Sequence, residues 1–65
     1  MPVITLEAAR LTREQKRQLV REFTESASRI MQMPADLFYV FLKESDPDNI
    51  GVGGTILSER GKNKR

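Results

Sequence analysis

Hydrophobic and polar positions divide this 65-residue chain into a strand, a long helix and a second strand. Residues 3–7 are rich in β-branched side chains and alternate through Leu6, which is typical of a strand. Thr12 followed by Gln15 forms a capping-box signature, so the helix should begin there and run for about 20 residues. We expect it to end before Pro34, because the residue preceding a proline is disfavoured in helical geometry. Its predicted apolar face consists of Leu19, Val20, Phe23, Ala27, Ile30 and Met31.

The second predicted strand, residues 37–43, is apolar on both of its faces. Phe38, Val40 and Leu42 should point one way, and Leu37, Tyr39 and Phe41 the other. One face can pack on the helix within the same subunit. The other needs a partner from outside it, because a strand with two apolar faces is typical of one buried on both sides.

The C-terminal part of the chain is predicted to be a loop followed by a tight hairpin. Residues 44–49 contain Pro47 and several acids, and Gly51, Gly53 and Gly54 then precede a short run at 55–57. These glycines favour a close turn of the backbone. The glycine segment is too short for a dinucleotide site, and we predict no helix after it to hold a phosphate.

The order of strand, helix and strand predicts an α+β fold. The subunit is expected to be a β-α-β unit with a parallel two-stranded sheet plus a short C-terminal hairpin, since a helical crossover makes the joined strands parallel. We place a single domain at residues 2–58 and a basic tail at 59–65. Two subunits would form a four-stranded sheet, and the face still uncovered predicts further association.

Composition narrows the routes to stability and to chemistry. The chain has neither Cys nor His, so it offers no disulfide and lacks the commonest metal ligand and general base. We therefore expect no metal site. A chain of this size buries only about 60% of its unfolded surface, which leaves oligomerisation as the remedy. No membrane span or signal peptide is visible, and a Cys-free chain suits the reducing cytoplasm, where we expect it.

Positive charge is concentrated at the C-terminus. The net charge is +2, but residues 59–65 alone carry +3, so residues 1–58 sum to −1. A basic tail is compatible with nucleic-acid binding by a small, non-enzymatic oligomeric protein. A solvated terminus explains the same charges, so we do not expect a nucleic-acid partner.

Pro2 carries the most distinctive candidate chemistry. Methionine is commonly removed before a small residue, and Pro2 would then begin the mature chain with a secondary amine. An internal proline nitrogen carries no proton, whereas a terminal one is a base. The alternative is that Pro2 only opens the strand.

These residues together resemble the 4-oxalocrotonate tautomerase family. The resemblance rests on Pro2, Arg10, the helix opening Glu14-Gln15-Lys16, Pro34 and the segment Gly51-Val52-Gly53-Gly54, and it covers residues 2–57. It implies β-α-β subunits that pair into dimers, three of which form a hexamer. It also implies a cofactor-free isomerase, of a family associated with aromatic degradation. The Pro2 amine would move a proton in a small carboxylate substrate, a 2-hydroxydienoate or 2-keto acid.

The resemblance also suggests residues around this base. Arg10 is the candidate for holding the substrate carboxylate, although counting back from the helix places Leu11 at the family position; Arg13 is a weaker alternative. Tyr39 stands where the prototype of the 4-oxalocrotonate tautomerase family has a second arginine. A phenol donates one hydrogen bond without bringing a charge. Ile50 replaces an aromatic wall residue. An apolar wall and nearby arginines both lower the pKa of an amine, which suits a base working near neutral pH.

Two alternatives remain open at the level of sequence. A dehalogenase, hydratase or decarboxylase of the same superfamily would use Pro2 with acidic groups that activate water, for which Glu7, Glu44 and Asp48 are candidates. The assembly is expected to be a homohexamer, and a heteromer with a second, similar chain is the other possibility. The loss of one arginine and one aromatic residue indicates a different or poorer substrate than 4-oxalocrotonate, and we expect weak activity both on that compound and on simple enols such as phenylpyruvate enol.

Overall fold

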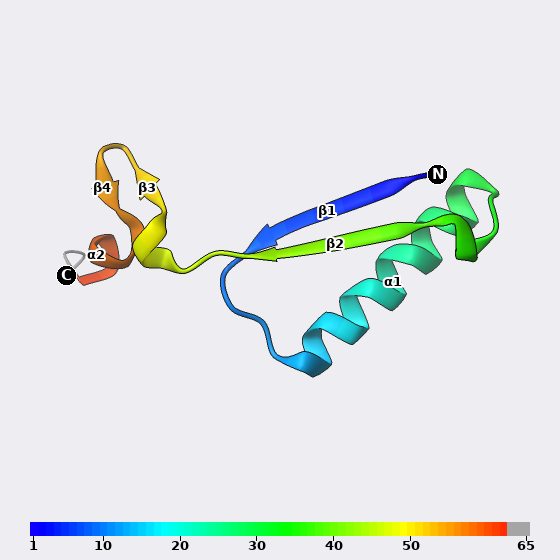
Figure 1. Ribbon diagram of the computed structural model, residues 1–65, viewed down its shortest axis with the longest axis horizontal. Helices are drawn as coiled ribbons and strands as arrows, with labels where there is room; N and C mark the ends of the chain where they lie inside the picture. Colours follow the sequence, from blue (N-terminus) through cyan, green and yellow to red (C-terminus); the bar gives the residue numbers. More distant parts are fainter. Residues whose placement is uncertain (63–65) are drawn as a thin grey trace.

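The computed structural model describes residues 1–62 and has the predicted β-α-β order. Strand β1 (Val3–Ala8), helix α1 (Arg13–Met31) and strand β2 (Tyr39–Glu44) form the body of the subunit (Figure 1). Strands β3 (Gly51–Val52) and β4 (Thr55–Ile56) form an antiparallel hairpin, and helix α2 (Leu57–Lys62) follows it. Two 3-10 turns, η1 (Ala35–Leu37) and η2 (Pro47–Asn49), complete the chain. The predicted α+β class, with its parallel sheet and C-terminal hairpin, is confirmed.

Strands β1 and β2 pair in parallel along their whole length. Val3 lies opposite Tyr39 at one end and Ala8 opposite Glu44 at the other. The pairing extends beyond both ends, because the Tyr39 N–H donates to the Pro2 carbonyl (3.1 Å) and the Ser45 N–H donates to the Ala8 carbonyl (2.8 Å). The sheet is therefore one fixed strip with Pro2 at one end and the β1–α1 loop at the other.

Helix α1 begins and ends for the reasons visible in the sequence. The Thr12 side chain accepts from the Gln15 N–H (3.1 Å), and the Gln15 side chain accepts from the Thr12 N–H (2.9 Å), which completes the capping box. At the other end Gln32 takes left-handed backbone geometry with φ of 57°, and its N–H donates to the Ser28 carbonyl. This cap ends the helix at Met31, three residues before Pro34.

Only part of the predicted apolar face of α1 packs within the subunit. Leu19, Phe23 and Ala27 are half-buried, but Val20, Ile30 and Met31 are exposed, Ile30 by 71%. The sequence predicted one apolar face, and the single subunit covers only part of it. A sheet of two strands is narrow and covers only a narrow stripe of the helix.

Strand β2 has the two-sided character that the sequence predicts, although it begins at Tyr39, because η1 takes up residues 35–37. Val40 and Leu42 are half-buried on the side that carries Ile4 and Leu6 of β1. Tyr39 and Phe41 lie on the opposite face of the sheet and are 50% and 48% exposed. The sheet face away from α1 is uncovered in the single subunit.

The subunit is extended, and its apolar core is incomplete. No residue in the described part of the chain is fully buried. The radius of gyration is 15.7 Å, against about 11 Å for a compact chain of this length. The accessible surface is 5302 Å², against about 4,200 Å² for a folded monomer of this mass. Both values exceed those of a compact monomer, so the apolar surface of the single subunit is only partly covered. Among the described residues, no helix combines the length and apolar character needed to cross a bilayer.

Residues 47–62 form a C-terminal arm that extends beyond the Glu44 end of the sheet, at the opposite end from the N-terminus (Figure 1). Gly53 and Gly54 have φ of 61° and 91°, so the predicted hairpin turn occupies positions that favour glycine. The arm is closed by the Leu57 N–H, which donates to the Ile50 carbonyl (2.7 Å), and by the Ser58 hydroxyl, which donates to Asp48.

Helix α2 was not predicted, and the expectation of no helix after the glycines was wrong. The sequence of α2 has no apolar periodicity of its own. It begins at Leu57 and Ser58, the two residues whose hydrogen bonds close the arm. Its start is therefore set by these contacts rather than by a pattern within its own sequence. α2 crosses the point at which we divided domain from tail. Residues 63–65 of that tail lie outside the described residues.

Candidate functional site

Pro2 lies at the beginning of β1 and beside the beginning of β2. Its carbonyl accepts from the Tyr39 N–H, so the two predicted site residues share one end of the sheet. Their side chains do not share a face. Pro2 continues the half-buried series of Ile4 and Leu6, whereas Tyr39 belongs to the exposed series on the other face. Within one subunit the Tyr39 phenol therefore points away from Pro2.

The state of the Pro2 nitrogen depends on Met1. Met1 is 79% exposed, and its peptide bond makes the Pro2 nitrogen an amide without basic character. The candidate base therefore exists only in the chain from which Met1 has been removed.

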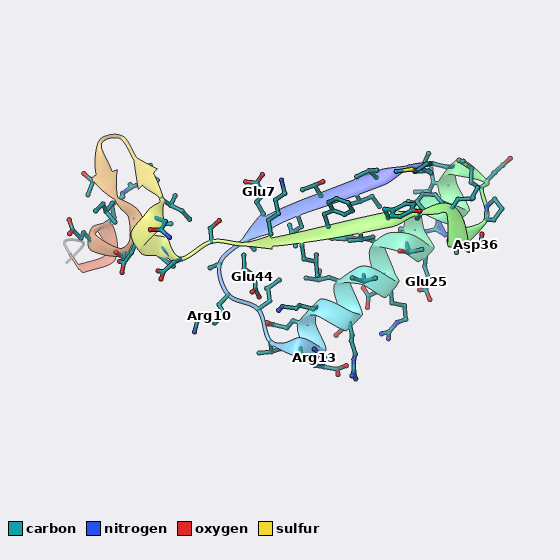
Figure 2. The ribbon with its side chains drawn as sticks, in the orientation of Figure 1. Glu7, Arg10, Arg13, Glu25, Asp36 and Glu44 are labelled. Carbon is teal, nitrogen blue, oxygen red and sulfur yellow. The ribbon has the colours of Figure 1, made fainter. Side chains whose placement is uncertain are left out.

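Arg10 lies in the short loop between β1 and α1, at the other end of the sheet. Figure 2 shows its side chain extending from the loop away from α1, whereas Arg13 lies in the first turn of the helix. Both residues are exposed. Of the two, Arg10 is the one carried by the loop that precedes the helix.

Glu44, at the end of β2, reaches the same loop. Its carboxylate Oε2 accepts from the Leu11 N–H (3.0 Å) and lies 3.1 Å from the Lys16 Nζ. The Leu11 hydrogen bond, the Lys16 contact and the nearby charge of Arg10 hold the pKa of Glu44 below its ordinary value of 4.5. Glu44 is therefore a fixed carboxylate in contact with the residue that follows Arg10.

Ile50 also lies at the Arg10 end of the subunit. It follows η2, and with Leu57 it lines a cavity of about 370 Å³ between the arm and the end of β1. The remaining lining residues are Glu7, Ala8, Ala9 and Ser45. This cavity has one apolar side, formed by Ile50 and Leu57, next to the loop that carries Arg10.

The four predicted site residues fall into two groups at opposite ends of the sheet. Pro2 and Tyr39 form one group, and Arg10 and Ile50 the other. Strand β1 has six residues, which at about 3.3 Å per residue separates the two ends by about 20 Å. No small carboxylate can touch Pro2 and Arg10 of the same subunit, so a site that uses both residues needs a second subunit.

The acids considered for water activation do not gather around Pro2. Glu7 lines the cavity at the other end of the sheet. Asp48 accepts a hydrogen bond from Ser58 in the arm, and Glu44 accepts one from the Leu11 N–H in the β1–α1 loop. Among residues 1–62, no group of three acidic side chains could hold a metal ion.

Sequence reasoning identified Glu44 only as a candidate for water activation and missed its contact with the loop. The partners Leu11 and Glu44 are 33 residues apart in the chain, and no local pattern connects them. The only available signal was the parallel pairing itself, which places the end of β2 next to the end of β1.

Comparison with known families gives one match over nearly the whole chain. A family described as "Tautomerase enzyme" matches residues 2–60. A comparison with curated proteins found no match.

Several solved structures share the fold. A crystal structure of a 4-oxalocrotonate tautomerase homologue is 35% identical, with a TM-score of 0.83, over 91% of this chain and 95% of that one. TomN, a homologue in the tomaymycin biosynthetic pathway, is 22% identical, with a TM-score of 0.91, over 98% of this chain and 100% of its own. A heterohexameric 4-oxalocrotonate tautomerase from Chloroflexus aurantiacus is 22% identical, with a TM-score of 0.76, over 91% of this chain and 95% of its own. At their identities, the last two show the fold alone.

Proposed function

We propose, from the premise that this chain belongs to the tautomerase family, that it is a cofactor-free enol–keto tautomerase whose general base is the amine of Pro2. The observation that carries the proposal is the family match, which extends from Pro2 to residue 60. The chemistry of the chain agrees with it. With no His and no Cys in the sequence, a terminal prolyl amine is the group best suited to take and return a proton near neutral pH.

The reaction needs only this proton transfer. The amine takes the proton from the 2-hydroxyl of the enol as the carbonyl forms. The resulting prolyl ammonium then delivers a proton to the neighbouring carbon, which gives the 2-keto acid and restores the base. Atoms and electrons balance without an oxidant or a reductant.

The separation of Pro2 from Arg10 supports a site shared between subunits. If two subunits join their sheets edge to edge about a twofold axis perpendicular to the sheet, the paired edge strands run antiparallel. The Pro2 end of one subunit then lies beside the Arg10 end of the other. The exposed apolar face, with Val3, Tyr39 and Phe41, supports further association of such dimers. We propose a homohexamer.

The side chains favour a substrate with one carboxylate. Arg10 provides a charged fork for that group. The candidate at the position of the prototype's second arginine is Tyr39, which contributes a neutral donor from a neighbouring subunit, and Ile50 contributes an apolar wall. This combination suits a 2-keto acid with an apolar side chain, such as phenylpyruvate, better than a dicarboxylate. We expect only weak activity on 4-oxalocrotonate.

The decisive experiment compares ketonisation of phenylpyruvate enol by the native protein and by Pro2→Ala. Intact-mass spectrometry first establishes that Met1 is absent from the native protein. Loss of a positioned base is expected to lower kcat/KM by about 100-fold or more. Equal rates, or full activity in a preparation that retains Met1, would refute the role of Pro2.

The same preparations address the related activities of the superfamily. Release of halide or carbon dioxide from small acid substrates, lost in Pro2→Ala, would favour a dehalogenase or decarboxylase over a tautomerase. The tautomerase is favoured because Glu44 already accepts from the Leu11 N–H and pairs with Lys16, and Asp48 already accepts from Ser58, so neither carboxylate is free to activate water.

A further inference from the structure

We propose that Glu44 is a positioning residue that fixes the β1–α1 loop so that Arg10 presents its guanidinium to the substrate carboxylate. This inference rests on the proposed function and adds to it a residue that does not touch the substrate. It follows from three features of the loop: how its ends are held, what holds its middle, and which cation pairs with Glu44.

The ends of the loop are held by the backbone and by the helix cap. Ala8 is bound to Ser45 through its carbonyl, and Thr12 is locked in the capping box with Gln15. These contacts fix where the loop begins and ends. They leave the path of residues 9–11 undetermined.

The middle of the loop is held by Glu44. The Leu11 N–H donates to Oε2 of Glu44 at 3.0 Å, and Leu11 directly follows Arg10. A charged acceptor makes this hydrogen bond stronger than a neutral one. The position of Arg10 is thus set from β2, an element that belongs to the rigid sheet.

The cation that pairs with Glu44 is Lys16, not Arg10. Its Nζ lies 3.1 Å from the same Oε2, and Arg10 forms no ion pair with any described residue of the subunit. Arg10 is nevertheless close enough for its charge to lower the pKa of Glu44. By neutralising Glu44, Lys16 leaves the Arg10 guanidinium available for a carboxylate from outside.

Figure 2 shows this arrangement directly. The Glu44 side chain extends from the end of β2 toward the loop, and the Arg10 side chain extends from the loop to the outside. The carboxylate and the guanidinium therefore lie on the inner and outer sides of the same short segment.

The test measures ketonisation kinetics of Glu44→Ala in the native and the Arg10→Ala backgrounds. If Glu44 acts through Arg10, Glu44→Ala raises KM by about tenfold, a middle value for directly coupled residues, with little change in kcat. In the Arg10→Ala background the same substitution changes neither constant. Glu44→Gln, whose amide oxygen can still accept from Leu11, should recover much of the loss.

Glu25→Ala is the matched control, since it removes an exposed carboxylate from the middle of α1, away from the loop (Figure 2). Lys16→Met is a second test, because Glu44 can then pair with Arg10 and KM should rise although Arg10 is unchanged. Lys16→Met keeps the proposal falsifiable if Glu44→Ala does not assemble.

The proposal is overturned if Glu44→Ala leaves KM at the native value, or if it lowers kcat/KM equally in both backgrounds. An unchanged KM in Lys16→Met also contradicts it. Failure of the proposed function is a different result, since it appears as full activity in Pro2→Ala. The two failures are therefore distinguishable.

Discussion

Phe41 provides the sharpest test of the claim that the subunit completes its core by association. It lies at the centre of the sheet face that α1 does not cover, between Tyr39 and Lys43, and it is 48% exposed. We predict that Phe41→Asp prevents assembly.

The magnitude follows from the exposed area. A phenylalanine presents about 200 Å², so the exposed half is about 100 Å². At about 25 cal/mol per Å² its burial contributes about 2.5 kcal/mol per subunit. A contact between two such faces that buries both copies of Phe41 gains about 5 kcal/mol, and its loss weakens the association of these faces on the order of several thousandfold. A buried, unpaired carboxylate adds a further desolvation penalty.

Sedimentation velocity across a range of concentrations measures the effect. The native protein should sediment as an oligomer, and Phe41→Asp as a smaller and less structured species. Ser26→Asp, which adds the same carboxylate at an exposed polar position of α1, should behave as native. A Phe41→Asp protein with native mass, or a native protein that is a folded monomer, would refute the reasoning.

Two further predictions concern stability at a fixed protein concentration. Thr12→Ala removes the acceptor for the Gln15 N–H and should lower the free energy of unfolding by about 1 kcal/mol per subunit in urea titrations; an unchanged midpoint would show that the cap contributes nothing. The folded pKa of Glu44 is below its ordinary value of 4.5, so its contribution is complete above that value and is lost as pH falls through the lower folded pKa. The urea midpoints of native protein and Glu44→Gln should therefore differ at pH 6 and converge toward pH 3, and a difference that stays constant would contradict the assignment.

The body of the fold could be predicted from the sequence because its signals are local. The structure confirms the capping box at Thr12 and Gln15. It also confirms the alternation of β2, with Val40 and Leu42 half-buried on one face and Tyr39 and Phe41 exposed on the other. The glycine turn was also predicted from a local signal, and in the structure Gly53 and Gly54 do have positive φ.

The features that the sequence did not predict depend on which surfaces pack against each other in the folded subunit. Periodicity placed Val20 and Ile30 on the apolar helix face, but it contains no information on how wide a sheet covers that face. Helix α2 was missed because its start depends on contacts made by Leu57 and Ser58 with distant residues.

The candidate site shows the same limit. Family resemblance named Pro2, Arg10, Tyr39 and Ile50 together, but only the parallel register shows that they lie at two ends of one strip. The hydrogen bond from the Leu11 N–H to Glu44 joins residues 33 apart in the chain, so no local pattern predicted it.

The distance between Pro2 and Arg10 along β1 has a genetic consequence. If each site takes its base from one chain and its arginine from another, as proposed above, two inactive alleles complement each other. A subunit without the proline still lends its arginine to a neighbour, and a subunit without the arginine still lends its proline. After gene duplication, each copy is therefore free to lose one of the two residues while the mixed ring stays active, which gives a direct evolutionary route from a ring of identical chains to one built from two.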